Sequence, residues 1–224
     1  MTAPLDVVTG AFSYSGGYIA ERLLARGRKV RTLTAHPDRP SALKGRIEAR
    51  PLDFERPERL VEALRGCDTL YNNYWVRFDH GAFTHEKAVR DNRTLFAAAA
   101  KAGVRRIVHV SIANADPASD LPYYRGKGLV EEALRGAGPS YAILGPTVLF
   151  GGRDVLINNI AWLLRRFPVF AIAGDGTSPI QPVAVEDLAD LAVEAGAEDG
   201  NSRRDAVGPE TFVYGEIVRL IAAR

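Results

Sequence analysis

Short apolar runs and longer amphipathic stretches alternate along the first two thirds of the chain. The apolar runs predict buried strands at residues 5–9, 29–34, 47–51, 68–73, 106–111 and 141–144. Apolar residues at helical spacing predict helices at residues 17–27, 57–65, 81–101 and 123–135. Strands that alternate with helices are typical of a parallel sheet with helices on both faces. The pattern therefore predicts an α/β, doubly wound fold.

The last third of the chain has a less regular pattern. It predicts helices at residues 156–167, 186–196 and 214–223, and short extended segments at 148–152, 182–185 and 205–208. We expect a single compact unit with a core at residues 1–150. Residues 151–224 then form a small lobe, interleaved with the last strand and helix of the core. The 156–167 helix is apolar on most sides, so it packs into the lobe, covers a ligand as a lid, or binds a partner.

The turn between the first strand and the first helix is rich in glycine. Its spacing is G-x-x-S-x-x-G, in which Gly10 allows a sharp turn and Gly16 lets the helix start close to the strand. Ser13 takes the position of a middle glycine. Free N–H groups at such a helix terminus bind a pyrophosphate, so we predict a dinucleotide site, with a purely structural turn as the alternative. Further predicted contacts in this loop are Phe12, Tyr14 and Ser15.

The residues after the second strand indicate which dinucleotide binds. An NAD site usually has an acidic residue there, which holds the ribose hydroxyls and repels the extra phosphate of NADP. Here the strand ends at Thr34, and His36 and Arg39 follow. The sequence therefore favours NADP over NAD, with Asp38 as the residue that argues for NAD.

Polar side chains also follow the later strands, at the edge of the sheet where ligands bind. Asn73 and Tyr74 end the fourth strand, and they either line a cofactor or substrate or cover the edge of the core. Pro146 and Thr147 follow the sixth strand and are assigned to the cofactor site as well. Asn92 falls on the apolar face of its helix, where a buried amide needs hydrogen-bond partners.

Tyr123 and Lys127 are four residues apart at the start of a predicted helix, and therefore lie on one face. A nearby ammonium group lowers the pKa of a phenol by about 1 to 3 units, toward useful acid/base chemistry. An ordinary amphipathic surface pair has the same spacing. Ser111 stands at the carboxyl end of the fifth strand, where it can join such a site.

Charge and cysteine content narrow the possible partners. The net charge is +2, with basic residues scattered along the chain, so neither nucleic acid nor an acidic membrane is indicated. No apolar run approaches the roughly 20 residues of a membrane span. Cys67 is the only cysteine, so we expect no disulfide framework, no metal site and a reducing, cytoplasmic location.

Several of these motifs occur together in one order. They are Thr9-Gly10-x-x-Ser13-x-x-Gly16, Asp53-Phe54, Asn92, Val108-His109-Val110-Ser111, Tyr123-x-x-x-Lys127 and Pro182-Val183-x-Val185-x-Asp187. On these residues the chain resembles the short-chain dehydrogenase/reductase superfamily, in its extended and atypical branch. That branch includes NAD-dependent epimerase/dehydratase-like proteins, NmrA-like proteins and proteins similar to subunit 9 of the complex I alpha subcomplex. The resemblance spans nearly the whole chain and implies a Rossmann-type sheet with a small, shortened substrate lobe.

The resemblance also implies roles for individual residues. Tyr123 would exchange a proton with the substrate oxygen, and Ser111 would hydrogen-bond that oxygen. Lys127 would hold the nicotinamide ribose and lower the pKa of Tyr123, with Asn92 ordering the site. The glycine turn would hold the pyrophosphate. Asp53 and Phe54 would line the adenine, although an aspartate there also suits a turn or helix cap.

The function implied is that of an NAD(P)-dependent oxidoreductase acting on a small carbonyl or alcohol substrate, in a chain that pairs as a homodimer. One alternative is a catalytically silent NAD(P)H-binding redox sensor or assembly subunit, and a weaker one is a sugar-nucleotide epimerase or dehydratase. The sequence departs from the superfamily pattern at Ser13, at Gly145, where relatives commonly carry arginine, and in stopping at Arg224.

Overall fold

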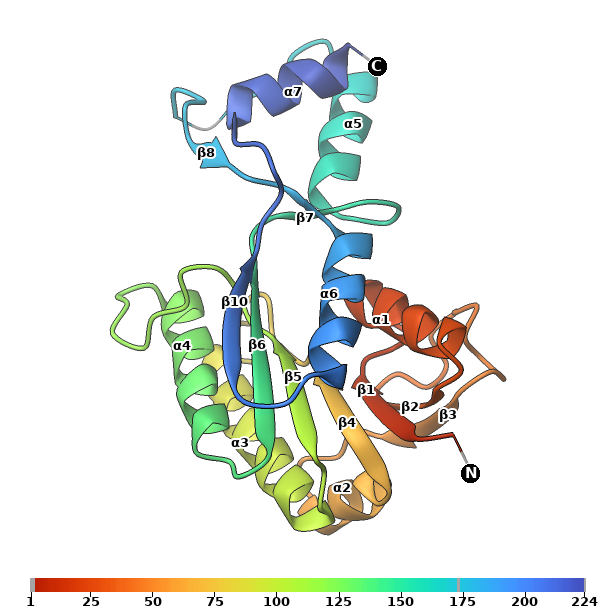
Figure 1. Ribbon diagram of the computed structural model, residues 1–224. Coiled ribbons are helices and arrows are strands. Elements are labelled where there is room, and N and C mark those ends of the chain that lie inside the picture. Colours follow the sequence, from red (N-terminus) through yellow and green to blue (C-terminus); the bar gives the residue numbers. More distant parts are fainter. Residues whose placement is uncertain (1–2, 173, 224) are drawn as a thin grey trace.

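The computed structural model describes residues 3–172 and 174–223. Seven parallel strands form its central sheet in the order β10-β6-β5-β4-β1-β2-β3 (Figure 1). The strands are β1 Leu5–Thr9, β2 Lys29–Thr34, β3 Glu48–Pro51, β4 Cys67–Asn72, β5 Arg106–Val110, β6 Ser140–Pro146 and β10 Ser202–Ala206. The order reverses at β1 and β4, and ligands of such sheets bind at that point, outside the carboxyl ends of the strands.

Helices cover both faces of this sheet, as the sequence predicts. α1 (Tyr14–Ala25) and α6 (Val185–Ala197) pack on one face. α2 (Pro57–Leu64), α3 (His85–Ala102) and α4 (Pro122–Arg135) pack on the other. Side chains alternate between the faces of a strand, so Val8 joins the first core and Val7 the second. The predicted Rossmann-type, doubly wound fold is confirmed.

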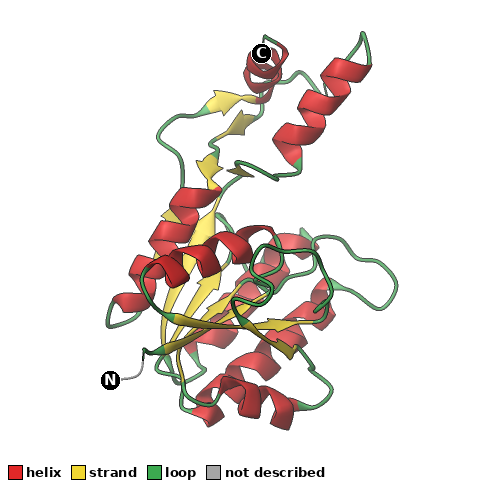
Figure 2. Cartoon of the chain, turned by 90° about the vertical axis from the view of Figure 1, so that its right-hand side faces the viewer, coloured by secondary structure: helices red, strands yellow, loops and turns green. Residues whose placement is uncertain are grey.

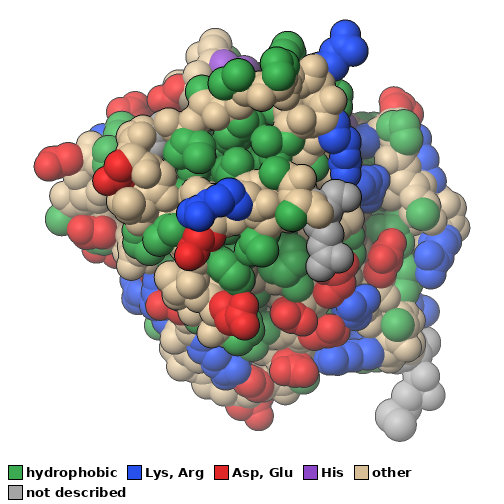
Figure 3. All heavy atoms as spheres, turned by 90° about the horizontal axis from the view of Figure 1, so that it is seen from above, with side chains coloured by type: hydrophobic (Ala, Val, Ile, Leu, Met, Phe, Trp, Pro, Cys, Tyr) green, Lys and Arg blue, Asp and Glu red, His purple; other side chains and the backbone are tan. Residues whose placement is uncertain are grey.

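A small lobe stands beyond the carboxyl ends of the central strands, at the top of Figure 1 and of Figure 2. It contains β7 Leu149–Phe150, α5 Leu156–Arg166, β8 Pro179–Ile180, β9 Val183–Ala184, β11 Phe212–Val213 and α7 Tyr214–Ala222. The chain enters the lobe after β6, returns to the core as α6 and β10, and enters the lobe again. Seen from above, this end of the molecule has a hollow in which hydrophobic side chains gather (Figure 3).

Several element boundaries differ from those predicted, and two of the differences have a clear cause. α3 begins at His85 rather than at residue 81, because the Thr84 side chain caps it by accepting a hydrogen bond from the Lys87 amide at 3.1 Å. β10 covers Ser202–Ala206 rather than 205–208, because it follows the register of β6, where Ser202 lies opposite Ala142. Among the described residues no helix is both long and apolar enough to cross a membrane.

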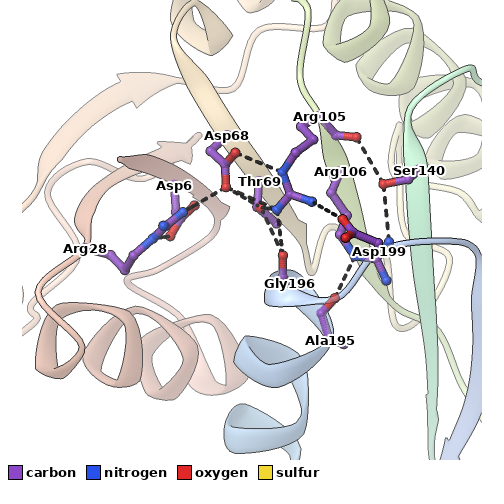
Figure 4. Close-up of polar contacts among 10 residues, drawn as sticks. All are labelled: Asp6, Arg28, Asp68, Thr69, Arg105, Arg106, Ser140, Ala195, Gly196 and Asp199. Carbon is purple, nitrogen blue, oxygen red and sulfur yellow. Dashed lines mark hydrogen bonds and ion pairs between the residues drawn. The ribbon is translucent and has the colours of Figure 1, made fainter. Parts of the chain in front are cut away.

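Charged side chains tie the strands together at the amino ends of β1, β4 and β5 (Figure 4). The guanidinium of Arg28 donates to both carboxylate oxygens of the fully buried Asp6, at 2.6 and 2.7 Å, and to Asp68 at 2.9 Å. Arg105 donates to Asp68 as well, and the two arginines lower the pKa of that carboxyl to about 2. This network lies at the edge of the sheet opposite the ligand-binding edge.

Candidate functional site

The glycine turn has the geometry that a pyrophosphate requires. Gly10 has a φ of +67°, and a Cβ atom at Gly16 would lie 2.9 Å from the Gly10 carbonyl carbon and closer still to its oxygen. Ser13 donates its hydroxyl hydrogen to the Gly10 carbonyl, which keeps the turn closed. Within the described chain no side chain caps the first amides of α1, so these N–H groups remain available to an anion.

A cavity of about 470 Å³, here called the turn-side cavity, opens beside this turn. Its walls include Gly10, Phe12 and Ser13 from the turn and Thr34, His36 and Arg39 from the end of β2 and the loop after it. Asn73 and Tyr74 line it directly after β4, so eight of the predicted cofactor residues share one cavity. The exposed Arg39 places a cation at its rim.

The structure places Asp53 and Phe54 in other contacts. Asp53 accepts a hydrogen bond from the Arg56 side chain at 2.6 Å, in an ion pair three residues along the chain. The Phe54 ring packs against the Tyr74 ring with centroids 4.7 Å apart. Leu52, which the sequence did not single out, lines the turn-side cavity from this part of the chain.

A buried polar network lies beneath the cavity. The Asn72 side chain accepts a hydrogen bond from Thr9 at 3.2 Å and donates to Asn92 at 2.6 Å. Asn92 in turn donates to the Ala88 carbonyl at 2.8 Å, so it acts as the predicted polar strut and braces the end of β4. His109 lies 3.0 Å from the Asn72 amide, and burial lowers its pKa well below the usual value, which keeps the imidazole neutral.

Asn73 is the residue that this network presents to the ligand edge. Its backbone amide donates to the Thr9 hydroxyl at 2.7 Å, and its side chain lines both the turn-side cavity and the next one along the edge. Both polar atoms of that side chain are buried and have no hydrogen-bond partner in the described chain. Buried amides are normally hydrogen-bonded, so Asn73 and the glycine cradle together fit a bound dinucleotide.

The next cavity, here called the lobe-side cavity, has a volume of about 640 Å³. It contains seven further predicted residues of the site, which are Tyr14, Ser15, Ser111, Tyr123, Lys127, Pro146 and Thr147. Asn73, Trp75 and Arg77 line this cavity and the turn-side cavity alike, so the two form one continuous cleft. The cleft follows the carboxyl ends of the central strands.

Trp75 contacts both the tyrosine and the lysine of the site. Its ring meets the Tyr123 ring edge-on, with centroids 5.9 Å apart, and the Lys127 ammonium lies 4.8 Å from the centre of the Trp75 ring. Gly126 makes room for it, because a Cβ atom there would lie 2.8 Å from Trp75. Such a cation over an aromatic face is stabilised without a carboxylate partner.

The predicted effect of Lys127 on Tyr123 is corrected by this arrangement. Lys127 donates a hydrogen bond to the Val110 carbonyl at 3.1 Å, and burial lowers its own pKa to about 7. The pKa of Tyr123 is raised, because burial of the phenol outweighs the opposing effect of Arg77. Tyr123 is therefore a protonated phenol at neutral pH.

Ser111 faces a charged partner that the sequence analysis missed. Its hydroxyl donates to the buried carboxylate of Glu131 at 2.7 Å, and Glu131 is also paired with Arg135 and Arg203. Glu131 lies four residues after Lys127, and that spacing was the available signal. The Ser111 hydroxyl therefore donates its only hydrogen to Glu131.

The absence of an arginine at position 145 also has a structural basis. A Cβ atom at Gly145 would lie 2.6 Å from a carboxylate oxygen of Asp205 and 3.2 Å from the guanidinium of Arg203. β10 thus supplies an arginine beside the position where relatives commonly carry one on β6. A hydrogen bond joins the core to the lobe at the glycine turn, where the Tyr14 hydroxyl donates to the Gly151 carbonyl at 2.8 Å.

Comparison with known proteins shows the family to which the chain belongs. The model of a family described as NAD(P)H-binding matches residues 10–160. One relative is NADH dehydrogenase [ubiquinone] 1 alpha subcomplex subunit 9, mitochondrial, of Arabidopsis thaliana. It is 25% identical, and the match covers 96% of this chain and 56% of the relative. Another is a (4-alkanoyl-5-oxo-2,5-dihydrofuran-3-yl)methyl phosphate reductase of Streptomyces griseus, 28% identical over 94% of this chain and 70% of the relative.

Solved structures of similar fold include a UDP-N-acetylglucosamine 4-epimerase from Bacillus cereus. It superposes with a TM-score of 0.83 at 19% identity, over 99% of this chain and 81% of the epimerase. At that identity the likeness concerns the fold alone. This chain spans little more than half the length of the mitochondrial relatives from Arabidopsis thaliana and Neurospora crassa.

Proposed function

Because the chain belongs to the NAD(P)H-binding family, within the short-chain dehydrogenase/reductase superfamily, we propose that it is an NADPH-dependent oxidoreductase acting on a small carbonyl or alcohol substrate. One observation carries the proposal. The continuous cleft brings the glycine turn, the unpartnered Asn73 amide and Tyr123 to one edge of the sheet. The reductase relative from Streptomyces griseus supports it.

The bound nicotinamide supplies or accepts the hydride. Tyr123, protonated at neutral pH, donates its proton to the substrate oxygen, which is the step that reduction of a carbonyl requires. Lys127 holds a ribose with the ammonium hydrogens that the Val110 carbonyl leaves free. The amides of the glycine turn bind the pyrophosphate, and Asn73 hydrogen-bonds the cofactor with its unpartnered amide. In this proposal Ser111 only accepts a hydrogen bond, since Glu131 holds its hydrogen.

A second candidate is a protein that binds the cofactor without turnover. Two observations favour it: Lys127 is held by the Trp75 ring and the Val110 carbonyl rather than by Tyr123, and Ser111 donates its hydroxyl hydrogen to Glu131. The mitochondrial relative, named as a subunit of NADH dehydrogenase, supports this candidate. Binding of NADPH with no reduction of any carbonyl compound in a broad panel would decide for it.

Cofactor binding is tested by titrating the protein with NADPH and following the nicotinamide fluorescence. We expect Gly16→Ala to weaken binding about tenfold, because the new methyl group forces α1 away from the Gly10 carbonyl. Gly17→Ala is the matched control, since a Cβ atom there lies 3.4 Å from the Ala11 carbonyl, at ordinary contact distance. Equal affinity in all three proteins would show that the turn is only structural.

The preference for NADPH is expected to depend on Arg39. Arg39→Ala should weaken NADPH binding about tenfold and leave NADH binding nearly unchanged, because only NADPH carries a 2′-phosphate for this cation to pair with. Asp38→Ala is the opposite test: removing the acidic residue that argues for NAD should leave NADPH binding as tight or tighter. Tighter binding of NADH than of NADPH by the unmodified protein would contradict the preference.

A further inference from the structure

The lobe contributes an apolar wall to the cleft. α5 directs Leu156, Ile160 and Leu163 into the lobe-side cavity, and their spacing of four and three residues puts them on one helical face. Further apolar residues of this wall are Val148, Leu149, Val155 and Phe170. Tyr123 lines the same cavity.

Charged groups occur only at the core end of the described lining. They are Arg77, which also lines the turn-side cavity, and Lys127, whose ammonium is held by the Val110 carbonyl and the Trp75 ring. On the lobe side the polar side chains of the lining are Asn159 and Tyr214, both uncharged. Arg165 of α5 lines a separate cavity, between α5 and α7.

This distribution decides what the lobe can bind. A phosphate or a sugar placed against leucine and isoleucine loses its hydration without gaining hydrogen bonds, which is costly. An alkyl chain or a hydrocarbon ring in the same place is stabilised by leaving water. Resting on the proposed function, we infer that the substrate has an uncharged, apolar body that packs on α5 and a carbonyl or alcohol group that reaches Tyr123.

The test is isothermal titration of the protein, with and without saturating NADP⁺, using 2-alkanones from 2-butanone to 2-decanone. We expect the affinity to rise about fourfold for each added methylene group until the cavity is full. Leu163→Asn should weaken 2-decanone binding about tenfold, since it places an unpaired amide in the apolar wall. Leu164→Asn, the same change at the next position of α5 and outside the described lining, should change it less than twofold.

Three outcomes would overturn the inference: an affinity independent of chain length, equal losses in the two asparagine variants, or tighter binding of UDP-glucose than of 2-decanone. Each variant is first shown to unfold at the temperature of the unmodified protein. NADP⁺ binding is measured in the same samples, so a protein that does not bind the cofactor is distinguished from one that does not bind the alkanone. The alkanone series without cofactor still tests the apolar wall in that case.

Discussion

Replacing Tyr123 by phenylalanine is expected to lower kcat for carbonyl reduction by a factor of about 100 to 10,000, the range typical of losing a general acid. The Kd for NADPH should stay within about twofold. The phenylalanine ring preserves the edge-on packing against Trp75 and His85, so the change removes little beyond the hydroxyl. The measurement is the initial rate of NADPH oxidation with a ketone that the unmodified protein reduces, paired with an NADPH titration.

Tyr124→Phe is the control for this prediction, because Tyr124 is the neighbouring and more exposed tyrosine and does not belong to the described cavity linings. Its kcat should match that of the unmodified protein. If Tyr123→Phe also retains full activity, the proton comes from another group and the proposed mechanism is wrong. The proposal of cofactor binding does not depend on that outcome.

Arg106→Met is expected to lower the free energy of unfolding by about 2 to 4 kcal/mol. The fully buried guanidinium donates to the carbonyl of Ala195, near the end of α6 (Figure 4), and to that of Gly200 in the loop beyond it, each at 2.6 Å. Methionine keeps the apolar stem of the side chain but leaves these carbonyls without a donor. Equilibrium unfolding in urea, with circular dichroism as the signal, measures the loss.

The adjacent arginine provides the control. Arg105 keeps 41% of its side chain exposed while it pairs with Asp68 and donates to the Gly196 carbonyl at 2.9 Å. Water can replace such contacts, so Arg105→Met should cost at most about 1 kcal/mol. Similar losses at both positions would mean that the cap on α6 contributes no more than a surface ion pair.

Most of the fold could be predicted from the sequence, because local patterns dictate it. Gly103 ends α3 in the left-handed conformation, and Pro57 begins α2, both as their chemistry favours. The boundaries that were missed depend on other kinds of contact. α3 starts late because Thr84 caps it, and β10 takes its register from β6, which lies far away in the sequence.

The composition of the site was more predictable than its geometry. The sequence correctly brings Tyr123 and Lys127 to one cavity, since strand ends and a helix start determine their place. It could not reveal that Trp75 packs against both of them or that Glu131 takes the hydrogen of Ser111. Both contacts arise from packing between separate elements. The raised pKa of Tyr123 likewise follows from burial, which helical spacing does not report.

The chain passes between core and lobe more than once, and this determines how the lobe could be replaced by that of another protein. Leu188, Ala192 and Val193 of α6 are buried in the same core as α1, although they follow the first lobe segment in the sequence. A cut after residue 150 would therefore remove a helix and an edge strand that the sheet needs. A chimera with a different specificity would have to carry residues 149–184 and 207–223 together and leave α6 and β10 in place.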